Sequence, residues 1–202
     1  MSILLRSSEI NKLPVVTFAG EDIAQIKDVM YAAHGGRVGG FTLNGRGLFA
    51  GPLKTALAWE TVVGLGPDAV IIQDESSLTP TESLLAAMQS SGQPPGDILG
   101  SQVLTDDGAA LGVVIDVVIE VAGDGSSQAD VVGYEIDPAE GWGRGTNPML
   151  IPLPDTLSAS GEHLMVPAAA REFVTDDLAG FGAAVDDFRA HLSLAFNLSA
   201  RV

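Results

Sequence analysis

One pattern occurs twice in this chain, and it limits the possible folds more than any other feature. The stretch "GEDIAQIKDVM", which starts at Gly20, returns as "GAALGVVIDVV", which starts at Gly108, eighty-eight residues later (108 − 20). Each begins with Gly, continues with spaced apolar residues and ends with an Asp-Val pair. Asp28 and Val29 correspond to Asp116 and Val117. A repeat of this kind predicts that one structural unit is used twice.

The surrounding segments repeat in the same order, which makes a chance match a poor explanation. Gly40-Phe41 in "RVGGFTL" corresponds to Gly133-Tyr134 in "DVVGYEI", and Val70 in "AVIIQ" corresponds to Leu164 in "HLMVP". The offsets are 88, 93 (133 − 40) and 94 (164 − 70), and they grow where the second repeat has longer loops. A duplicated fold with loop insertions predicts this monotonic growth.

Short segments rich in β-branched residues and separated by Gly predict a mainly β fold with about five strands in the first repeat. The segment Ile23 to Tyr31 fits a strand with a bulge or a short helix, and the strand is favoured because Gly20 opens a hairpin-like turn.

A helix is expected after each repeat. Thr79, Pro80 and Glu82 have the spacing of an N-cap, a first helical proline and a third-position acid. Thr175 is followed by two aspartates suited to a helix N-terminus. The second helix carries one apolar stripe: Val174, Leu178, Phe181, Val185, Phe188 and Leu192.

These signals predict two small β-barrels in tandem, each followed by an α-helix. The expected boundaries are 1–78 for the first barrel, 79–97 for a helix and linker, 98–172 for the second barrel and 173–202 for a C-terminal amphipathic helix. The linker "SSGQPPGD" combines flexible Ser and Gly with stiff Pro.

Charge limits the classes of partner. The net charge is −16, and residues 81–202 contribute −14 of it, from 18 acidic and 4 basic side chains. Such a surface repels phosphate, so direct nucleic-acid binding is not expected. Only the near-neutral first part, with Arg37, Arg46 and Lys54, could approach RNA. The chain has no cysteine, and no signal peptide or membrane span is evident, so we expect a soluble cytoplasmic protein.

The first repeat resembles the PRC-barrel family in "LPVVTFAGEDIAQIKDVMY", "GRVGGF" and "LAWETVVGLGPDAVIIQD". The resemblance covers residues 3–78, and a diverged second repeat covers about 97–168, where Leu153-Pro154 replaces Trp59-Glu60. The family includes the cytoplasmic domain of the photosynthetic reaction-centre H subunit and the C-terminal domain of a ribosome-maturation factor that acts on the small subunit. The resemblance implies a binding scaffold without shared catalytic residues, and neither specific function carries over.

Three places are candidates for partner binding. Trp59-Glu60 is either an interface anchor or a core Trp beside a solvated Glu. Trp142 and Arg144 lie in the Gly-rich loop "EGWGRGTNP", which is either a protein-contact loop or an ordinary hairpin insertion. Phe181 and Phe188 belong to a helix that covers either its own barrel or a partner subunit.

Catalytic and metal-binding patterns are weak. His34, His163 and His191 lack partners at metal-ligand spacing. A calcium-like spacing of acidic and polar residues begins at Asp124 but has Ala129 where that loop needs Gly. We therefore expect no cofactor and predict a non-enzymatic interaction or assembly module that binds a protein partner and self-associates. The alternatives are a small-ligand sensor with a cleft between the barrels and an RNA-associated assembly factor.

Overall fold

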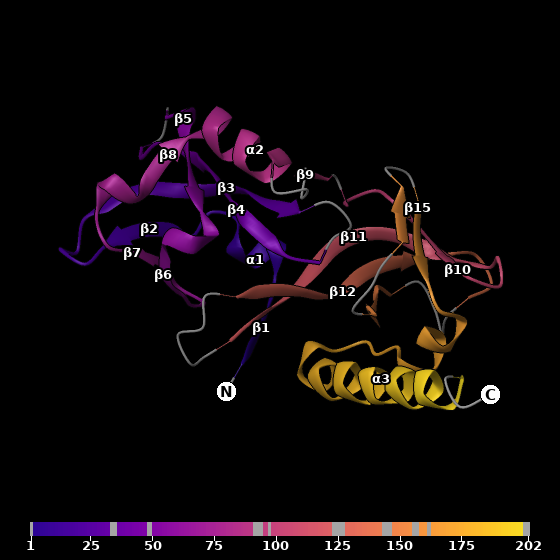
Figure 1. Ribbon diagram of the computed structural model, residues 1–202. Helices are drawn as coiled ribbons and strands as arrows, with labels where there is room; N and C mark the ends of the chain where they lie inside the picture. Colours follow the sequence, from indigo (N-terminus) through magenta and orange to yellow (C-terminus); the bar gives the residue numbers. More distant parts are fainter. Residues whose placement is uncertain are drawn as a thin grey trace. The chain divides into compact units, whose positions relative to one another are not determined.

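The computed structural model describes most of the chain and divides it into two compact units. The described residues are 2–32, 36–47, 50–90, 95–96, 98–122, 128–142, 147–154, 158–160 and 163–199. The first unit comprises residues 1–96 and 119–130, and the second comprises 97–118 and 131–202. Figure 1 shows that strands dominate and that a helix follows each sheet, so the predicted mainly β class is confirmed.

The first sheet has the strand order β6-β7-β2-β3-β4-β5-β8, and β9 pairs with β3. Its strands are β2 (Pro14–Thr17), β3 (Asp22–Ala32), β4 (Val38–Asn44), β5 (Pro52–Ala58), β6 (Val62–Leu65), β7 (Val70–Ile72), β8 (Leu78–Pro80) and β9 (Pro95–Gly96). The short helices are α1 (Ser7–Ile10), η1 (Trp59–Thr61) and η2 (Glu75–Ser77), and α2 (Thr81–Ser90) follows β8.

The second sheet has the order β13-β12-β11-β10-β15-β14, and β1 (Ile3–Arg6) pairs with β11. Its other strands are β10 (Gln102–Thr105), β11 (Ala110–Val121), β12 (Ala129–Pro138), β13 (Met149–Pro152), β14 (Ser158–Ser160) and β15 (His163–Val166). The 3-10 helix η3 (Ala168–Phe173) and the long helix α3 (Leu178–Ser199) complete the chain. None of the described helices is long and apolar enough to cross a membrane.

The order β6-β7-β2-β3-β4-β5 of the first sheet returns in the second as β14-β15-β10-β11-β12-β13, whereas β8 has no counterpart in the second order. The central strand β2 is paired with β3 on one side and, in parallel, with β7 on the other; β10 has the same relation to β11 and β15. Val15 lies opposite Val70, and Val103 lies opposite Leu164, which reproduces the sequence offsets of 88 and 94. Both hairpins also have a register shift after that valine.

The repeated Gly turn uses the same hydrogen bonds in both repeats. Gly20 N–H donates to Thr17 O at 2.8 Å, and Gly108 N–H donates to Thr105 O at 2.9 Å. Both glycines have positive φ, 83° and 86°, a conformation that favours Gly over any residue with a Cβ. The turn that marked the repeat in the sequence is therefore a structural hairpin.

The segment Ile23 to Tyr31 is a strand with bulges, which is the favoured prediction. It lies within β3, and the register against β4 shifts between Ile26 and Asp28 and again between Met30 and Tyr31. Asp28 is exposed beside Thr42, whereas Asp116 is buried and accepts a hydrogen bond from the Val117 N–H at 2.7 Å.

The helix starts differ from the predicted ones. Thr79 and Pro80 pair with Ala56 and Thr55 as part of β8, so α2 begins one residue later than predicted, at Thr81. Before α3, Thr175 bridges to Leu150, and the capping residue is Asp177, whose Oδ1 accepts from Gly180 N–H at 2.7 Å. Strand pairing thus takes Thr79, the predicted cap of α2, whereas Asp177 is one of the two aspartates that the sequence pattern placed at the N-terminus of α3.

In each sheet, one glycine leaves space for a side chain of the helix that follows. A Cβ at Gly40 would lie 2.4 Å from Leu57 O and 3.1 Å from Leu84 Cδ2 of α2. A Cβ at Gly133 would lie 2.6 Å from Ile151 O and 2.2 Å from Phe181 Cζ of α3. The paired positions Gly40 and Gly133 thus let a helix side chain approach the sheet, and α2 and α3 have the same role.

Candidate binding site

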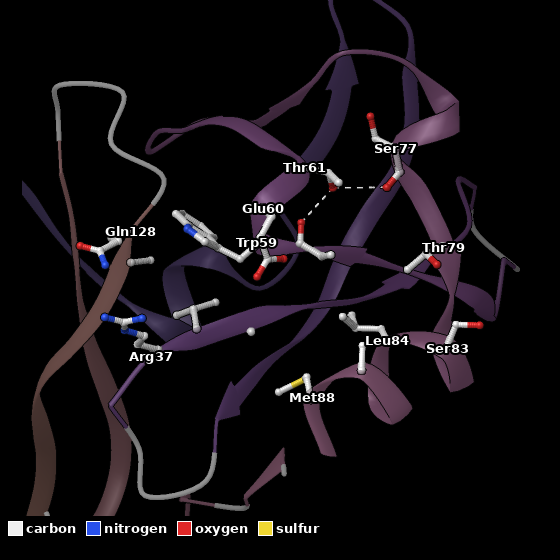
Figure 2. A pocket seen from close by; sticks show the side chains of 15 residues that line it. Arg37, Trp59, Glu60, Thr61, Ser77, Thr79, Ser83, Leu84, Met88 and Gln128 are labelled. Atoms are coloured by element: carbon white, nitrogen blue, oxygen red, sulfur yellow. Dashed lines mark hydrogen bonds between the residues drawn. The ribbon is translucent and has the colours of Figure 1, made fainter. Parts of the chain in front are cut away.

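A pocket in the first unit collects several of the residues that the sequence singled out. It has a volume of about 540 Å³. Its lining includes residues of β4, η1 and α2, together with Gln128 and Ala129 at the start of β12. Figure 2 shows Leu84 and Met88 on the α2 side and Trp59 and Glu60 on the η1 side. The volume falls within the roughly 300–1,000 Å³ that is usual for ligand pockets.

The Trp59-Glu60 step forms one wall of the pocket. Both residues lie in the 3-10 turn η1 between β5 and β6. Because of this turn, the side chains of Trp59 and Glu60 enter different environments. Trp59 is buried and packs edge-to-face on Phe41, with ring centroids 6.0 Å apart, whereas Glu60 is exposed at the pocket. Of the two interpretations that the sequence allowed, this arrangement agrees with a core Trp beside a solvated Glu.

The apolar floor depends on Gly39. A Cβ at this position would lie 2.5 Å from Met88 Cε and 3.0 Å from Met88 Sδ, so Gly39 gives the end of the Met88 side chain room to lie over β4. Leu84 and Met88 are both buried in the small core cluster that α2 forms with Met30 and Ala56. Since methionine adapts its shape readily, this floor can fit more than one apolar group.

The two charged side chains that line the pocket, Arg37 and Glu60, differ in their partners. Arg37 Nε lies 3.6 Å from Asp130 Oδ1, so its charge is opposed by a carboxylate. Among the described residues, no hydrogen bond or ion pair engages Glu60. Thr61 Oγ1 donates to Ala58 O at 2.9 Å and lies 3.3 Å from Ser77 O, which fixes the turn that carries Glu60. The pocket therefore offers an apolar floor and an available carboxylate.

The second repeat does not reproduce this site. At the aligned positions Leu153-Pro154 replaces Trp59-Glu60, and Leu153 is buried. Val132 stands where the first repeat has Gly39, and Val185 follows Phe181 by four residues as Met88 follows Leu84, the residues that face Gly133 and Gly40. The pocket is thus a specialisation of the first unit and not a consequence of the shared topology.

Phe181, Phe188 and Trp142 are not among the described residues that line this pocket. Phe181 and Phe188 are buried, and Phe188 packs on Phe173 with centroids 5.4 Å apart. Trp142 is partly exposed in the turn after β12, and Arg144 lies outside the described residues. The partner-binding role of these residues stays a prediction, although the packing shows that the stripe of α3 faces its own unit.

Other sequence candidates form no site in the described part of the chain. Asp124 and Ser126 of the calcium-like spacing, and His34, fall outside the described residues. Among the residues that are described, no cluster of three metal-ligating side chains occurs. His191 lies against Phe173, with ring centroids 5.6 Å apart, and Arg46 forms an ion pair with Asp22.

A polar cluster closes the turn before β11 in the second unit. Arg171 Nη2 lies 2.6 Å from Asp107 Oδ1 and 2.8 Å from Thr105 Oγ1, and the Thr105 hydroxyl donates to Asp107 Oδ1 at 2.5 Å. These contacts, first the Thr105 hydrogen bond and then Arg171, lower the pKa of the Asp107 carboxyl below its ordinary value of 3.8. The cluster ties η3 to the sheet.

Sequence reasoning found one wall of the pocket and missed the rest. Trp59 and Glu60 were singled out, but Gly39 and Met88 were not, because they come together only when α2 packs on β4. The adjacent glycines Gly39-Gly40 inside a strand were the available signal, since Gly within a strand often marks close approach of another group.

The comparisons with known proteins agree with the first repeat. The PRC-barrel domain family matches residues 3–78, the range over which the sequence resemblance was seen. No curated protein matches the chain. The second repeat lies outside the matched range, so its PRC-barrel character stays a prediction that rests on the shared strand order. Residues 3–78 of this chain are therefore a PRC-barrel domain.

Proposed function

We propose that this protein is a non-enzymatic binding module, an adaptor or assembly factor whose first unit receives a partner protein at the Trp59-Glu60 pocket. The observation that supports this most is the combination of an adaptable apolar floor with the available Glu60 carboxylate. The occupant that fits is a partner segment with an apolar side chain next to a basic one. The first unit carries 12 acidic and 6 basic side chains, which favours such a basic segment.

Site-specific photocrosslinking in cells tests this proposal. Ser83 lines the pocket, whereas Ala86 is an exposed residue of the same helix that does not line it. A benzoylphenylalanine at position 83 is expected to crosslink one recurring protein, and the same group at position 86 is the matched control. Adding Glu60→Lys to the position-83 variant should remove the crosslink. Equal crosslinking from both positions would contradict the proposal.

The pocket volume also favours a second candidate, the sensing of a small ligand, because about 540 Å³ suits a small organic molecule. A ligand with an apolar body and a cationic group would fit the same floor and Glu60. A thermal-shift screen of metabolites separates the two candidates. A shift that Glu60→Lys abolishes supports sensing, whereas absence of any shift across a broad library argues against it.

A further inference from the structure

The second unit has a pocket of its own, which we call the β13 pocket. Its volume is about 460 Å³, within the roughly 300–1,000 Å³ that is usual for ligand pockets. Its described lining comes from two segments: Asn147, Pro148 and Met149 at the start of β13, and Arg171 with residues 174–176 between η3 and α3. None of these residues lines the Trp59-Glu60 pocket, so the β13 pocket is independent of the proposed function.

The pocket lies where the second repeat lacks a strand that the first repeat has. In the first unit β8 pairs with β5 along its whole length. In the second unit the matching segment pairs with β13 by one bridge, in which Leu150 and Thr175 exchange hydrogen bonds of 2.8 and 3.1 Å. The next hydrogen-bonded pair of this antiparallel ladder would be Pro148 with Asp177, and Pro148 has no N–H to donate. The ladder therefore stops, and the β13 pocket opens beside the bridge.

Arg171 is held at one nitrogen and keeps its other donors available. Its Nη2 lies 2.6 Å from Asp107 Oδ1 and 2.8 Å from Thr105 Oγ1, and Thr105 is buried. Every contact of this guanidinium with the described residues goes through Nη2, so Nη1 and Nε have no partner among them. A carboxylate accepts short, charge-assisted hydrogen bonds from such donors. Arg171 thus offers a fixed cationic group to the pocket that it lines.

Asp176 adds a carboxylate to the same pocket. It is exposed, and no hydrogen bond or ion pair engages its side chain within the described part of the chain. Asn147 is exposed and equally unengaged by described residues, so its amide can donate or accept. Met149 and Val174 are half-buried and give the pocket apolar surface. The lining therefore presents both signs of charge around an apolar wall.

The balance of charge decides which ligand fits. Asp107 already opposes Arg171, so Asp176 leaves an excess of negative charge, in a unit with 14 acidic and 4 basic side chains. A purely anionic ligand would be repelled, and a purely cationic one would not use the Arg171 donors. We propose that the β13 pocket binds a small amino acid as its zwitterion. The carboxylate lies on Arg171, the ammonium group on Asp176 and an apolar side chain against Met149 and Val174.

Amide NMR of the isotope-labelled full chain, titrated with leucine at neutral pH, tests this proposal. We expect saturable shifts at Met149 and residues 174–177, with a dissociation constant on the order of 0.1–1 mM, because few groups hold a small ligand that stays partly solvated. N-acetylleucine lacks the ammonium group and leucinamide lacks the carboxylate, so each should bind about tenfold or more weakly than leucine. These two probes resemble the ends of a peptide and therefore separate a free amino acid from a chain terminus.

Asp176→Asn tests the assignment of the ammonium group. Leucine should bind this variant about tenfold more weakly than the parent, and the preference for leucine over N-acetylleucine should disappear. A structural effect of the substitution would lower both affinities and keep the preference. Glu172→Gln is the matched control, because it removes an exposed carboxylate of η3 that does not line the pocket. This control should keep both the affinity and the preference.

Three results would overturn the proposal. The first is the absence of saturable shifts up to about 10 mM leucine, an affinity too weak for a site of this kind. The second is equal binding of leucine and N-acetylleucine by the parent. The third is a set of shifts confined to the Trp59-Glu60 pocket, which would place leucine in the first unit.

Discussion

At the residue scale, Lys12 and Gly100 show how closely the two repeats agree. Lys12 N–H donates to Ile26 O at 2.8 Å, and Gly100 N–H donates to Val114 O at 2.9 Å, so the two residues hold the same place. Their φ angles are 76° and 83°. Among the described residues other than Gly, Lys12 alone has a positive φ. One repeat therefore uses the residue suited to this conformation, and the other carries strain.

Exchanging these residue types should change stability in opposite directions. Lys12→Gly is expected to raise the free energy of unfolding by about 0.5–1 kcal/mol. The left-handed conformation costs a residue with a Cβ about 1–2 kcal/mol, and Gly removes this cost. Part of the gain is offset because Gly loses more backbone entropy on folding. Gly100→Ala should lower it by about 1 kcal/mol, because its Cβ would meet no atom within 4 Å and only the backbone penalty remains. Urea denaturation measures both.

Gly66→Ala is the control for this pair. Its Cβ would also meet nothing within 4 Å, and its φ lies outside the positive range. It should leave stability unchanged or slightly raised. A loss at Gly66 equal to that at Gly100 would show that the left-handed conformation is not the cause.

The lowered pKa of Asp107 predicts a defined pH dependence. A carboxyl whose pKa is lower in the folded state stabilises the fold above its unfolded pKa, near 3.8, and this contribution is lost as pH falls through the lower folded value. Asp107→Asn should therefore be less stable than the parent at neutral pH, and the difference should shrink as the pH falls below about 3.8. Thermal denaturation across pH measures the difference. Asp137→Asn, which removes one exposed charge on β12, is the control for the change of net charge.

At the element scale, local patterns predicted the strands and their order, and long-range pairing decided what those patterns could not. The Gly turns at Gly20 and Gly108 and the alternating apolar residues are local signals, so the hairpins and their offsets followed from the sequence. The cap predicted for α2 did not, because Thr79 pairs with Ala56 of β5, whereas Asp177, a local signal, does cap α3. The pocket needed α2 to lie on β4, and a single sequence contains no signal for that contact beyond Gly39-Gly40.

The helix α3 should behave as part of the second unit's core. Phe181 is buried against Gly133 and Ile151, so Phe181→Ala is expected to lower the free energy of unfolding by about 3–5 kcal/mol. Leu192→Ala, at a half-buried position of the same helix, is the control and should cost less. Urea denaturation gives both values, and amide exchange should show faster opening of β12 and β13 in the Phe181 variant.

Protein concentration separates packing within the chain from packing on another subunit. Because Phe181 contacts its own unit, the difference in the free energy of unfolding between Phe181→Ala and the parent should be the same at protein concentrations of about 1 and about 100 µM. A difference that grows with concentration would indicate that α3 covers a second subunit instead.

At the scale of the whole molecule, the two repeats have one topology and different surfaces. The first unit has the pocket with Trp59-Glu60, whereas the second has Leu153-Pro154 at those positions. The second unit is also the more acidic, with 14 acidic and 4 basic side chains against 12 and 6 in the first. Duplication allows this division, since one repeat can change its surface while the other retains the original contacts.

The acidic excess itself should limit stability at low salt. With 26 acidic and 10 basic side chains, like charges repel within the folded chain, and salt screens this repulsion. We expect the melting temperature to rise by about 2–4 °C between about 0.02 and about 0.5 M NaCl, which corresponds to about 1 kcal/mol for a chain of this size. Scanning calorimetry measures the melting temperature, and the rise should be the same at two protein concentrations that differ about tenfold. Glucose at matched osmolality is the control, because it does not screen charge; an equal rise in glucose would show that charge repulsion is not the cause.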